Sequence, residues 1–173
     1  CGSLYEKLSK VEHQIPGILV IDTPGHEVFT NLRSRGGSAA DIAILVVDAN
    51  RGFQPQTNES LKILESRKVP FVVALNKTDM ISGWKDTQTQ FITQAIKEQN
   101  TQVQTFLDEK IYNVVTALSV LGYQSEAFYR VQDYKKEIAI VPVSAKTGIG
   151  IPELFAVLVG LTQQFLKEKL NQE

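Results

Sequence analysis

The stretch VPFVVALNKTD, at residues 69–79, is a short apolar run that ends in four polar residues. Three similar runs occupy residues 17–22 (GILVID), 42–48 (IAILVVD) and 137–144 (EIAIVPVS). Apolar runs rich in β-branched residues are typical of strands that are covered on both faces, as in a parallel sheet. The four runs therefore predict a buried, mostly parallel β-sheet.

Helical patterns alternate with these strands. Residues 57–67 place Leu61, Ile63 and Leu64 on one side of a helix. Residues 151–170 repeat apolar side chains at helical spacing, and they open with a proline, which suits a first helical turn. Alternation of strands and helices predicts one α/β domain over residues 1–173, with three layers, α/β/α.

The segment at about residues 85–136 differs from the rest of the chain because it is rich in Gln and Thr. Its apolar residues still recur at helical spacing, so we expect two helices with a break near Asn100. A loop-rich stretch follows near Gly122. We interpret this segment as a helical insertion between the third and fourth strands.

Composition excludes several classes of protein. The 173 residues are 43% hydrophobic and 21% charged, and 18 basic against 19 acidic side chains give a net charge of −1. This balance argues against a general electrostatic nucleic-acid binder. One cysteine and two histidines argue against an internal disulfide and a structural zinc site. No apolar run reaches the roughly 20 residues of a membrane helix, so we expect a cytoplasmic protein without membrane contact.

The first polar motif, Asp22-Thr23-Pro24-Gly25-His26, directly follows a predicted strand. Ligands of open α/β sheets bind beyond the carboxyl ends of the strands. There, Asp22 can reach a magnesium ion through water, and Gly25 lets a backbone N–H approach a terminal phosphate. The alternative is a Pro-Gly turn in which Asp22 is a local cap.

Two further motifs also follow strands, namely Asn76-Lys77-Thr78-Asp79 and Ser144-Ala145-Lys146. The carboxylate of the first of these two motifs, Asp79, suits guanine, because guanine presents two N–H donors to it and adenine offers no matching pair. The Lys77 stem can lie over the base, and the N–H groups after the last strand can meet the guanine oxygen. Each motif alone is compatible with an ordinary capped turn, so the argument depends on the three together.

With these motifs the sequence resembles the translational GTPases of the P-loop class, and especially the G domain of the initiation factor five-B family. The stretches that carry the resemblance are residues 22–27, 31–37, 54–57, 76–79 and 83–85. The long helical segment favours the archaeal and eukaryotic branch. The resemblance implies a P-loop NTPase-like fold that binds GTP or GDP with Mg²⁺. It also implies a role in translation initiation, in which the protein promotes the joining of the ribosomal subunits and hydrolyses GTP when the large subunit engages.

The resemblance also implies roles for single residues. Asp22 would belong to the magnesium shell, through water, and Gly25 to the γ-phosphate, while His26 would orient the attacking water. The residues implied in the base pocket are Asn76, Lys77, Asp79, Ser144, Ala145 and Lys146. Arg33 and Arg35 are either a solvated helix end or a contact to ribosomal RNA.

The pattern G-x-x-x-x-G-K-[ST] occurs nowhere in the chain. Without it there is no backbone cradle for the phosphates, so we expect the P-loop and first strand to come from a further segment, in cis or in trans. Because the single methionine is Met80, residue 1 is not a translation start, and we expect a truncated, split or intein-derived piece. Without the P-loop, this piece is expected to be inactive alone. Two alternatives remain, namely a non-hydrolysing guanine-nucleotide-binding or scaffold module and an elongation-type translational GTPase.

Overall fold

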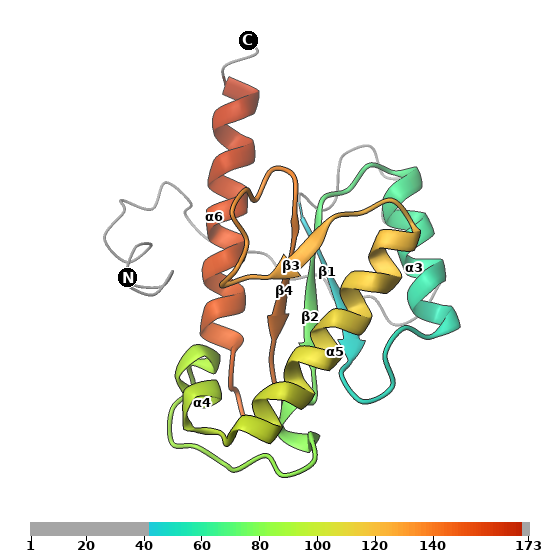
Figure 1. Ribbon diagram of the computed structural model, residues 1–173. Coiled ribbons are helices and arrows are strands. Elements are labelled where there is room, and N and C mark those ends of the chain that lie inside the picture. The colour runs from blue at the N-terminus through green and yellow to red at the C-terminus, as the bar shows by residue number, and fades with distance from the viewer. Residues whose placement is uncertain (1–41, 171–173) are drawn as a thin grey trace.

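The structure is a computed structural model, and it describes residues 42–170 (Figure 1). The elements are β1 (Ala43–Asp48), α3 (Pro55–Ser66), β2 (Phe71–Asn76), the short 3-10 helix η1 (Thr78–Met80), α4 (Ile92–Glu98), α5 (Thr101–Val120), β3 (Ser125–Ala127), β4 (Ile138–Pro142) and α6 (Ile151–Leu170). The strand predicted at residues 17–22, the 22–26 motif with Asp22, Gly25 and His26, and the arginines at 33 and 35 lie outside the described residues.

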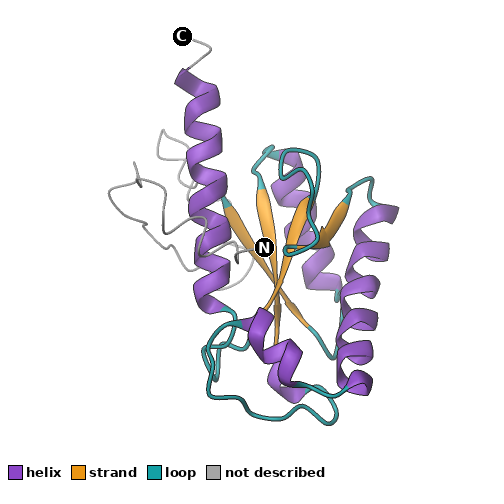
Figure 2. Cartoon of the chain, turned by 60° about the vertical axis from the view of Figure 1, so that its left-hand side comes forward, coloured by secondary structure: helices purple, strands orange, loops and turns teal. Residues whose placement is uncertain are grey.

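The described strands form one sheet in the order β1-β2-β4-β3, and every neighbouring pair is parallel. Figure 2 shows helices on both sides of this sheet. The α/β class, the parallel sheet and the three layers predicted from sequence are therefore confirmed for this part of the chain.

Strand β2 shows why its sequence is apolar throughout. Val73 and Leu75 pack with α3 and α5 on one face, whereas Val72 and Ala74 pack with α4 and α6 on the other. All four side chains are buried, because β2 is paired on both edges and covered on both faces. Its last residue, Asn76, is the first that emerges from the core.

The segment at about residues 85–136 is helical, and its predicted break near Asn100 is confirmed. Asn100 caps α5, since its side-chain oxygen accepts a hydrogen bond from the Val103 N–H, 2.9 Å away. The description as an insertion is incomplete, however. Leu107 and Ile111 of α5 are fully buried in the same cluster as β1, β2 and β4, so α5 is one of the layers that cover the sheet.

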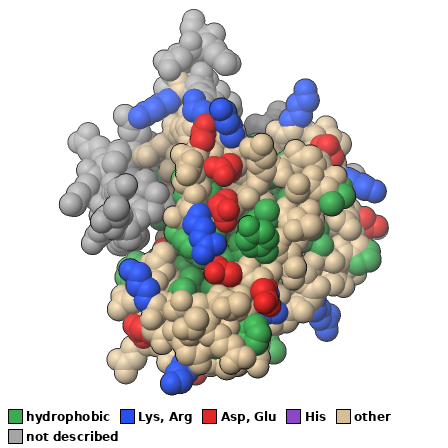
Figure 3. All heavy atoms as spheres, viewed as in Figure 1, with side chains coloured by type: hydrophobic (Ala, Val, Ile, Leu, Met, Phe, Trp, Pro, Cys, Tyr) green, Lys and Arg blue, Asp and Glu red, His purple; other side chains and the backbone are tan. Residues whose placement is uncertain are grey.

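The same segment also contains a strand that the apolar pattern did not reveal. β3 holds only Ser125, Glu126 and Ala127, and it pairs with β4 at the edge of the sheet. A three-residue edge strand needs no apolar run, because Ser125 and Ala127 are buried but only Ala127 belongs to the hydrophobic cluster. On the face of the molecule in Figure 3, basic and acidic side chains are interspersed rather than gathered by sign.

Candidate functional site

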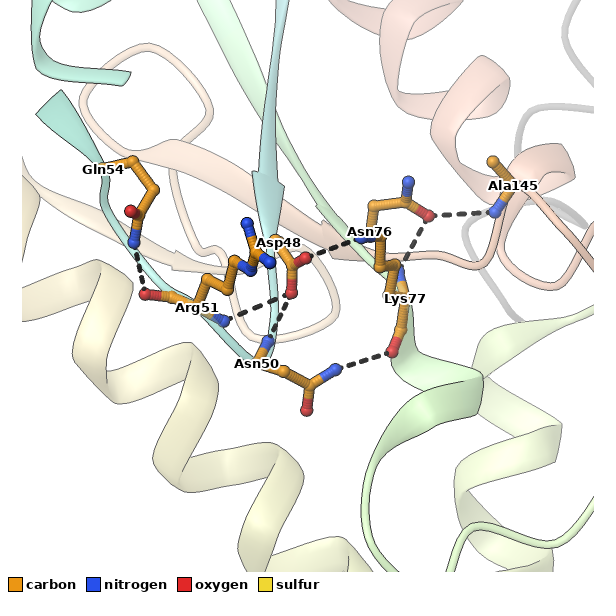
Figure 4. Close-up of polar contacts among 7 residues, drawn as sticks. All are labelled: Asp48, Asn50, Arg51, Gln54, Asn76, Lys77 and Ala145. Carbon is orange, nitrogen blue, oxygen red and sulfur yellow. Dashed lines mark hydrogen bonds and ion pairs between the residues drawn. The ribbon is translucent and has the colours of Figure 1, made fainter. Parts of the chain in front are cut away.

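The loops after β1, β2 and β4 meet at the carboxyl edge of the sheet (Figure 4). In the parallel register Asp48 lies opposite Asn76, so the last residues of β1 and β2 are neighbours. Thr78 fastens the loop after β2 to the segment after β4, because its N–H and its hydroxyl both donate to the Val143 carbonyl, at 3.2 and 2.9 Å. Thr78 is fully buried, which places its loop firmly against the sheet.

Asn76 joins two of the motifs that were predicted separately. Its Oδ1 accepts hydrogen bonds from the N–H of Lys77, at 2.8 Å, and from the N–H of Ala145, at 3.0 Å. Figure 4 shows the Nδ2 of Asn76 pointing away from both contacts. No residue of the described range accepts a hydrogen bond from that nitrogen, so the donor is available to a ligand.

Ser144 shapes the loop after β4. The residue is completely buried, and its hydroxyl oxygen accepts a hydrogen bond from the Thr147 N–H at 3.2 Å. Its backbone groups pair with Ile149 and Gly148, which closes a tight turn. This turn presents Ala145 and Lys146 at the surface, and the Lys146 N–H has no acceptor within residues 42–170.

Asp79 lies in η1, half-buried, two residues beyond Lys77. Within the described residues its carboxylate makes no hydrogen bond and no ion pair. A carboxylate without a partner in a loop that is otherwise closely hydrogen-bonded is a ready acceptor for a ligand with N–H donors. The edge therefore offers a carboxylate acceptor from Asp79, an amide donor from Asn76 and a backbone donor from Lys146.

Lys77 has a partner that the sequence pattern did not indicate. Its ammonium Nζ lies 2.9 Å from Oδ2 of Asp48, and Oδ1 of Asp48 accepts hydrogen bonds from the N–H groups of Asn50 and Arg51. Burial acts to raise the pKa of Asp48, but the hydrogen bond from Lys77 and those from the two backbone N–H groups outweigh it, so the pKa lies below its ordinary value. In the sequence, Asp48 stands out only as the polar residue that ends the apolar run of β1, as Asn76 ends that of β2.

The predicted phosphate and magnesium residues, Asp22 and Gly25, and the predicted catalytic His26 fall outside the described residues. Among residues that are described, no three His, Cys, Asp or Glu side chains are grouped so that they could hold a metal ion. None of the helices in this range is long and apolar enough to cross a membrane.

Comparison with known proteins gives consistent matches over nearly the whole chain. Residues 5–164 match the family described as the elongation factor Tu GTP-binding domain. The "probable translation initiation factor IF-2" of Sulfurisphaera tokodaii is 58% identical over 166 residues, which is 96% of this chain and 28% of that protein. The protein of the same name from Thermococcus sibiricus is 52% identical over 96% of this chain.

A solved structure agrees with these matches. The crystal structure of GDP-bound aIF5B from Aeropyrum pernix is 52% identical and superposes with a TM-score of 0.88, covering 95% of this chain and 28% of that one. The chain thus spans a little over a quarter of the length of the relatives that it matches.

Proposed function

Because this chain belongs to the family of elongation factor Tu GTP-binding domains, we propose that it is the base-reading part of a GTPase that acts in translation initiation. In this proposal the complete protein binds GTP or GDP with Mg²⁺ and hydrolyses GTP when the large ribosomal subunit engages. Similarity to proteins named translation initiation factor IF-2 supports the initiation branch over an elongation-type GTPase. The place of action is the cytoplasm, where the ribosomes are.

The observation that carries the proposal is the joined loop pair at the carboxyl edge. The Asn76–Ala145 hydrogen bond holds the two loops together, and within residues 42–170 the Asp79 carboxylate has no hydrogen-bond or ion-pair partner. Guanine presents two N–H donors to a carboxylate and an oxygen to a backbone N–H such as that of Lys146. Adenine lacks both features, and it would leave polar groups unpaired, which costs about 1–3 kcal/mol for each group.

The chemistry of hydrolysis is proposed from the resemblance of residues 22–27 to the family. Asp22 would reach magnesium through water, the N–H of Gly25 would meet the γ-phosphate, and His26 would hold the attacking water in line. Phosphoryl transfer requires little covalent participation by the protein, so positioning and charge stabilisation supply most of the catalysis. A bound magnesium ion would supply positive charge against the phosphate oxygens.

One edge of the sheet is consistent with the addition of a further segment, which would carry the P-loop. Within residues 42–170, β1 pairs only with β2, which leaves its other edge without a partner. Ile44 is 39% exposed and Val46 is 59% exposed, although both belong to the apolar run of β1. We propose that a strand and a helix from the P-loop segment, in cis or in trans, pair with this edge and cover these side chains.

The test is nucleotide binding by the completed domain, by which we mean the chain together with a polypeptide that carries a P-loop and the strand before it. Calorimetry should give tight binding of GDP, no measurable binding of ADP, and weak or no binding of either by the chain alone. Equal affinities for GDP and ADP would contradict the proposal. Binding of GTP without ribosome-stimulated hydrolysis would instead favour the non-hydrolysing module.

A further inference from the structure

The end of β1 and the turn that follows it contact both the side chain and the backbone of Lys77 (Figure 4). At the side-chain end, the ammonium of Lys77 lies 2.9 Å from the Asp48 carboxylate. At the backbone end, the Lys77 carbonyl accepts a hydrogen bond from the side-chain amide of Asn50, at 3.3 Å. One turn thus holds one lysine through two independent contacts.

The backbone of Lys77 needs such support. Its φ of 65° lies in the left-handed region, which is unfavourable for a residue with a side chain. Its N–H donates to Asn76 Oδ1, and its carbonyl accepts from the Met80 N–H as well as from Asn50. This conformation sends the chain from Asn76 into η1 and so decides where Asp79 stands relative to Asn76.

The side chain of Lys77 is likewise held before any ligand is present. The lysine side chain is 50% exposed, whereas that of Asp48 is only 19% exposed. Both oxygens of Asp48 are occupied, because Oδ1 accepts from the Asn50 and Arg51 N–H groups while Oδ2 faces the ammonium. This ion pair favours those rotamers of Lys77 that place its ammonium against Asp48, and so it restricts the aliphatic stem of the lysine.

We infer that Asp48 and Asn50 are positioning residues for base recognition, which act by holding Lys77. The aliphatic stem of Lys77 then forms a preformed apolar surface for a purine ring. The backbone of Lys77 places Asn76 and Asp79 so that both face the same edge of that ring. The inference rests on the proposed function, because it names residues that act on the base pocket through Lys77. Its physical basis is preorganisation: a side chain that is already ordered costs less entropy when the ligand binds.

The test is a double-mutant cycle in the completed domain. Asp48→Asn keeps an oxygen for the Asn50 and Arg51 N–H groups but removes the charge that attracts Lys77. Lys77→Met keeps an unbranched side chain but removes the ammonium. Asp48→Asn should weaken GDP binding about 3- to 10-fold, and it should have no further effect in the Lys77→Met background.

The matched control is Asp86→Asn, which makes the same charge change at an exposed position, and it should leave GDP affinity unchanged. An unchanged affinity in Asp48→Asn would overturn the inference. So would an equal loss in the wild-type and Lys77→Met backgrounds, because Asp48 would then act on stability or on another group rather than through Lys77.

A second measurement separates this inference from the proposed function, because it needs no nucleotide. In the ligand-free completed domain, the Cα and Cβ chemical shifts of Lys77 should report the left-handed conformation. In the Asp48→Asn, Asn50→Ala double variant they should move toward values averaged over several conformations. Unchanged shifts would overturn the inference even if GDP binds, whereas altered shifts without any binding of guanine nucleotides would count against the proposed function alone.

Discussion

The side-chain oxygen of Asn76 accepts a hydrogen bond from the backbone N–H of Ala145, 3.0 Å away, although the two residues are 69 positions apart in the sequence. This contact joins the loop after β2 to the loop after β4. It joins two short motifs, each compatible with an ordinary turn, into one candidate site with the Asp79 carboxylate on one side and the backbone N–H of Lys146 on the other.

The Asn76 contact predicts a protection pattern in hydrogen exchange. Asn76→Ala removes the acceptor, so the Ala145 N–H should exchange at least about 5-fold faster, since one hydrogen bond of this kind contributes roughly 1 kcal/mol or more. Asn76→Asp keeps an oxygen in the same place and should preserve the protection. Amide exchange followed by NMR in the completed domain checks both variants, and equal protection in Asn76→Ala and wild type would mean that the bond does not hold the loops together.

The backbone conformation and close packing of Gly150 predict that its substitution causes a large loss of stability. Its φ is 79°, and a Cβ there would press into the Pro142 carbonyl and lie 3.1 Å from Cα of Val143. Gly150→Ala should therefore cost about 3–5 kcal/mol of unfolding free energy in urea titrations of the completed domain. Gly122 has a φ of 87° and open space around it, so Gly122→Ala should cost only about 1–2 kcal/mol. Similar losses in both variants would show that the close packing beneath Gly150 is unimportant.

Glu153 predicts a pH dependence of stability. It is buried in the first turn of α6, and its carboxylate accepts hydrogen bonds from the N–H groups of Ile92 and Thr93 at the start of α4. Burial raises the pKa of Glu153, and the bonds from Ile92 and Thr93 only partly oppose this effect. The folded state then binds the proton more tightly than the unfolded state, so the stability associated with this group is complete below about pH 4.3 and falls as the pH rises through the folded pKa.

Unfolding in urea between about pH 4 and pH 8 tests this sign, with Glu153→Gln as the variant that cannot titrate. The free energy of unfolding of the wild type, minus that of Glu153→Gln, should decrease as the pH rises. Glu109→Gln, at an exposed glutamate, should show no such trend relative to wild type. A difference that increases with pH would mean that the backbone N–H groups, rather than burial, dominate the environment of Glu153.

The role proposed for His26 predicts that its substitution affects GTP hydrolysis but not GTP binding. If this side chain orients the attacking water, it acts mainly in the transition state. His26→Ala in the completed domain should leave GTP affinity within about 2-fold of wild type and slow ribosome-stimulated hydrolysis by roughly 100-fold or more. Equal losses in affinity and in rate would indicate a structural role for His26 instead.

Much of the fold follows from local sequence. The run at residues 69–76 predicts β2 because both faces of this strand are buried, and Asn100 marks the start of α5 because it caps the helix. β3 could not be predicted in the same way. Ser125-Glu126-Ala127 carries no apolar pattern, and it becomes a strand only because the edge of β4 provides its hydrogen-bond partners.

For the candidate site, too, some residues could be predicted from local sequence and others could not. Asn76, Lys77 and Asp79 could be chosen from sequence, because polar residues directly after a buried strand are conspicuous. The roles of Asp48 and Asn50 could not, since Asn50 meets Lys77 across 27 positions only through the pairing of β1 with β2. Ser144 was placed in the base pocket by resemblance, and the structure shows it buried, where it shapes the turn that presents Ala145 and Lys146.

The most direct test of the account is the base preference of Asp79→Asn in the completed domain, measured by calorimetry with GDP and with xanthosine diphosphate. An asparagine offers one donor and one acceptor where the carboxylate offers two acceptors, so it suits the 2-oxo group of xanthine better than the amine of guanine. We expect the dissociation constant for GDP to rise at least about 100-fold, because hydrogen bonds to a charged acceptor contribute roughly 1.5–3 kcal/mol each, while xanthosine diphosphate binds more tightly than to wild type. An unchanged affinity for GDP in Asp79→Asn, with Asp86→Asn as the control for the lost charge, would contradict the claim that this edge of the sheet reads guanine.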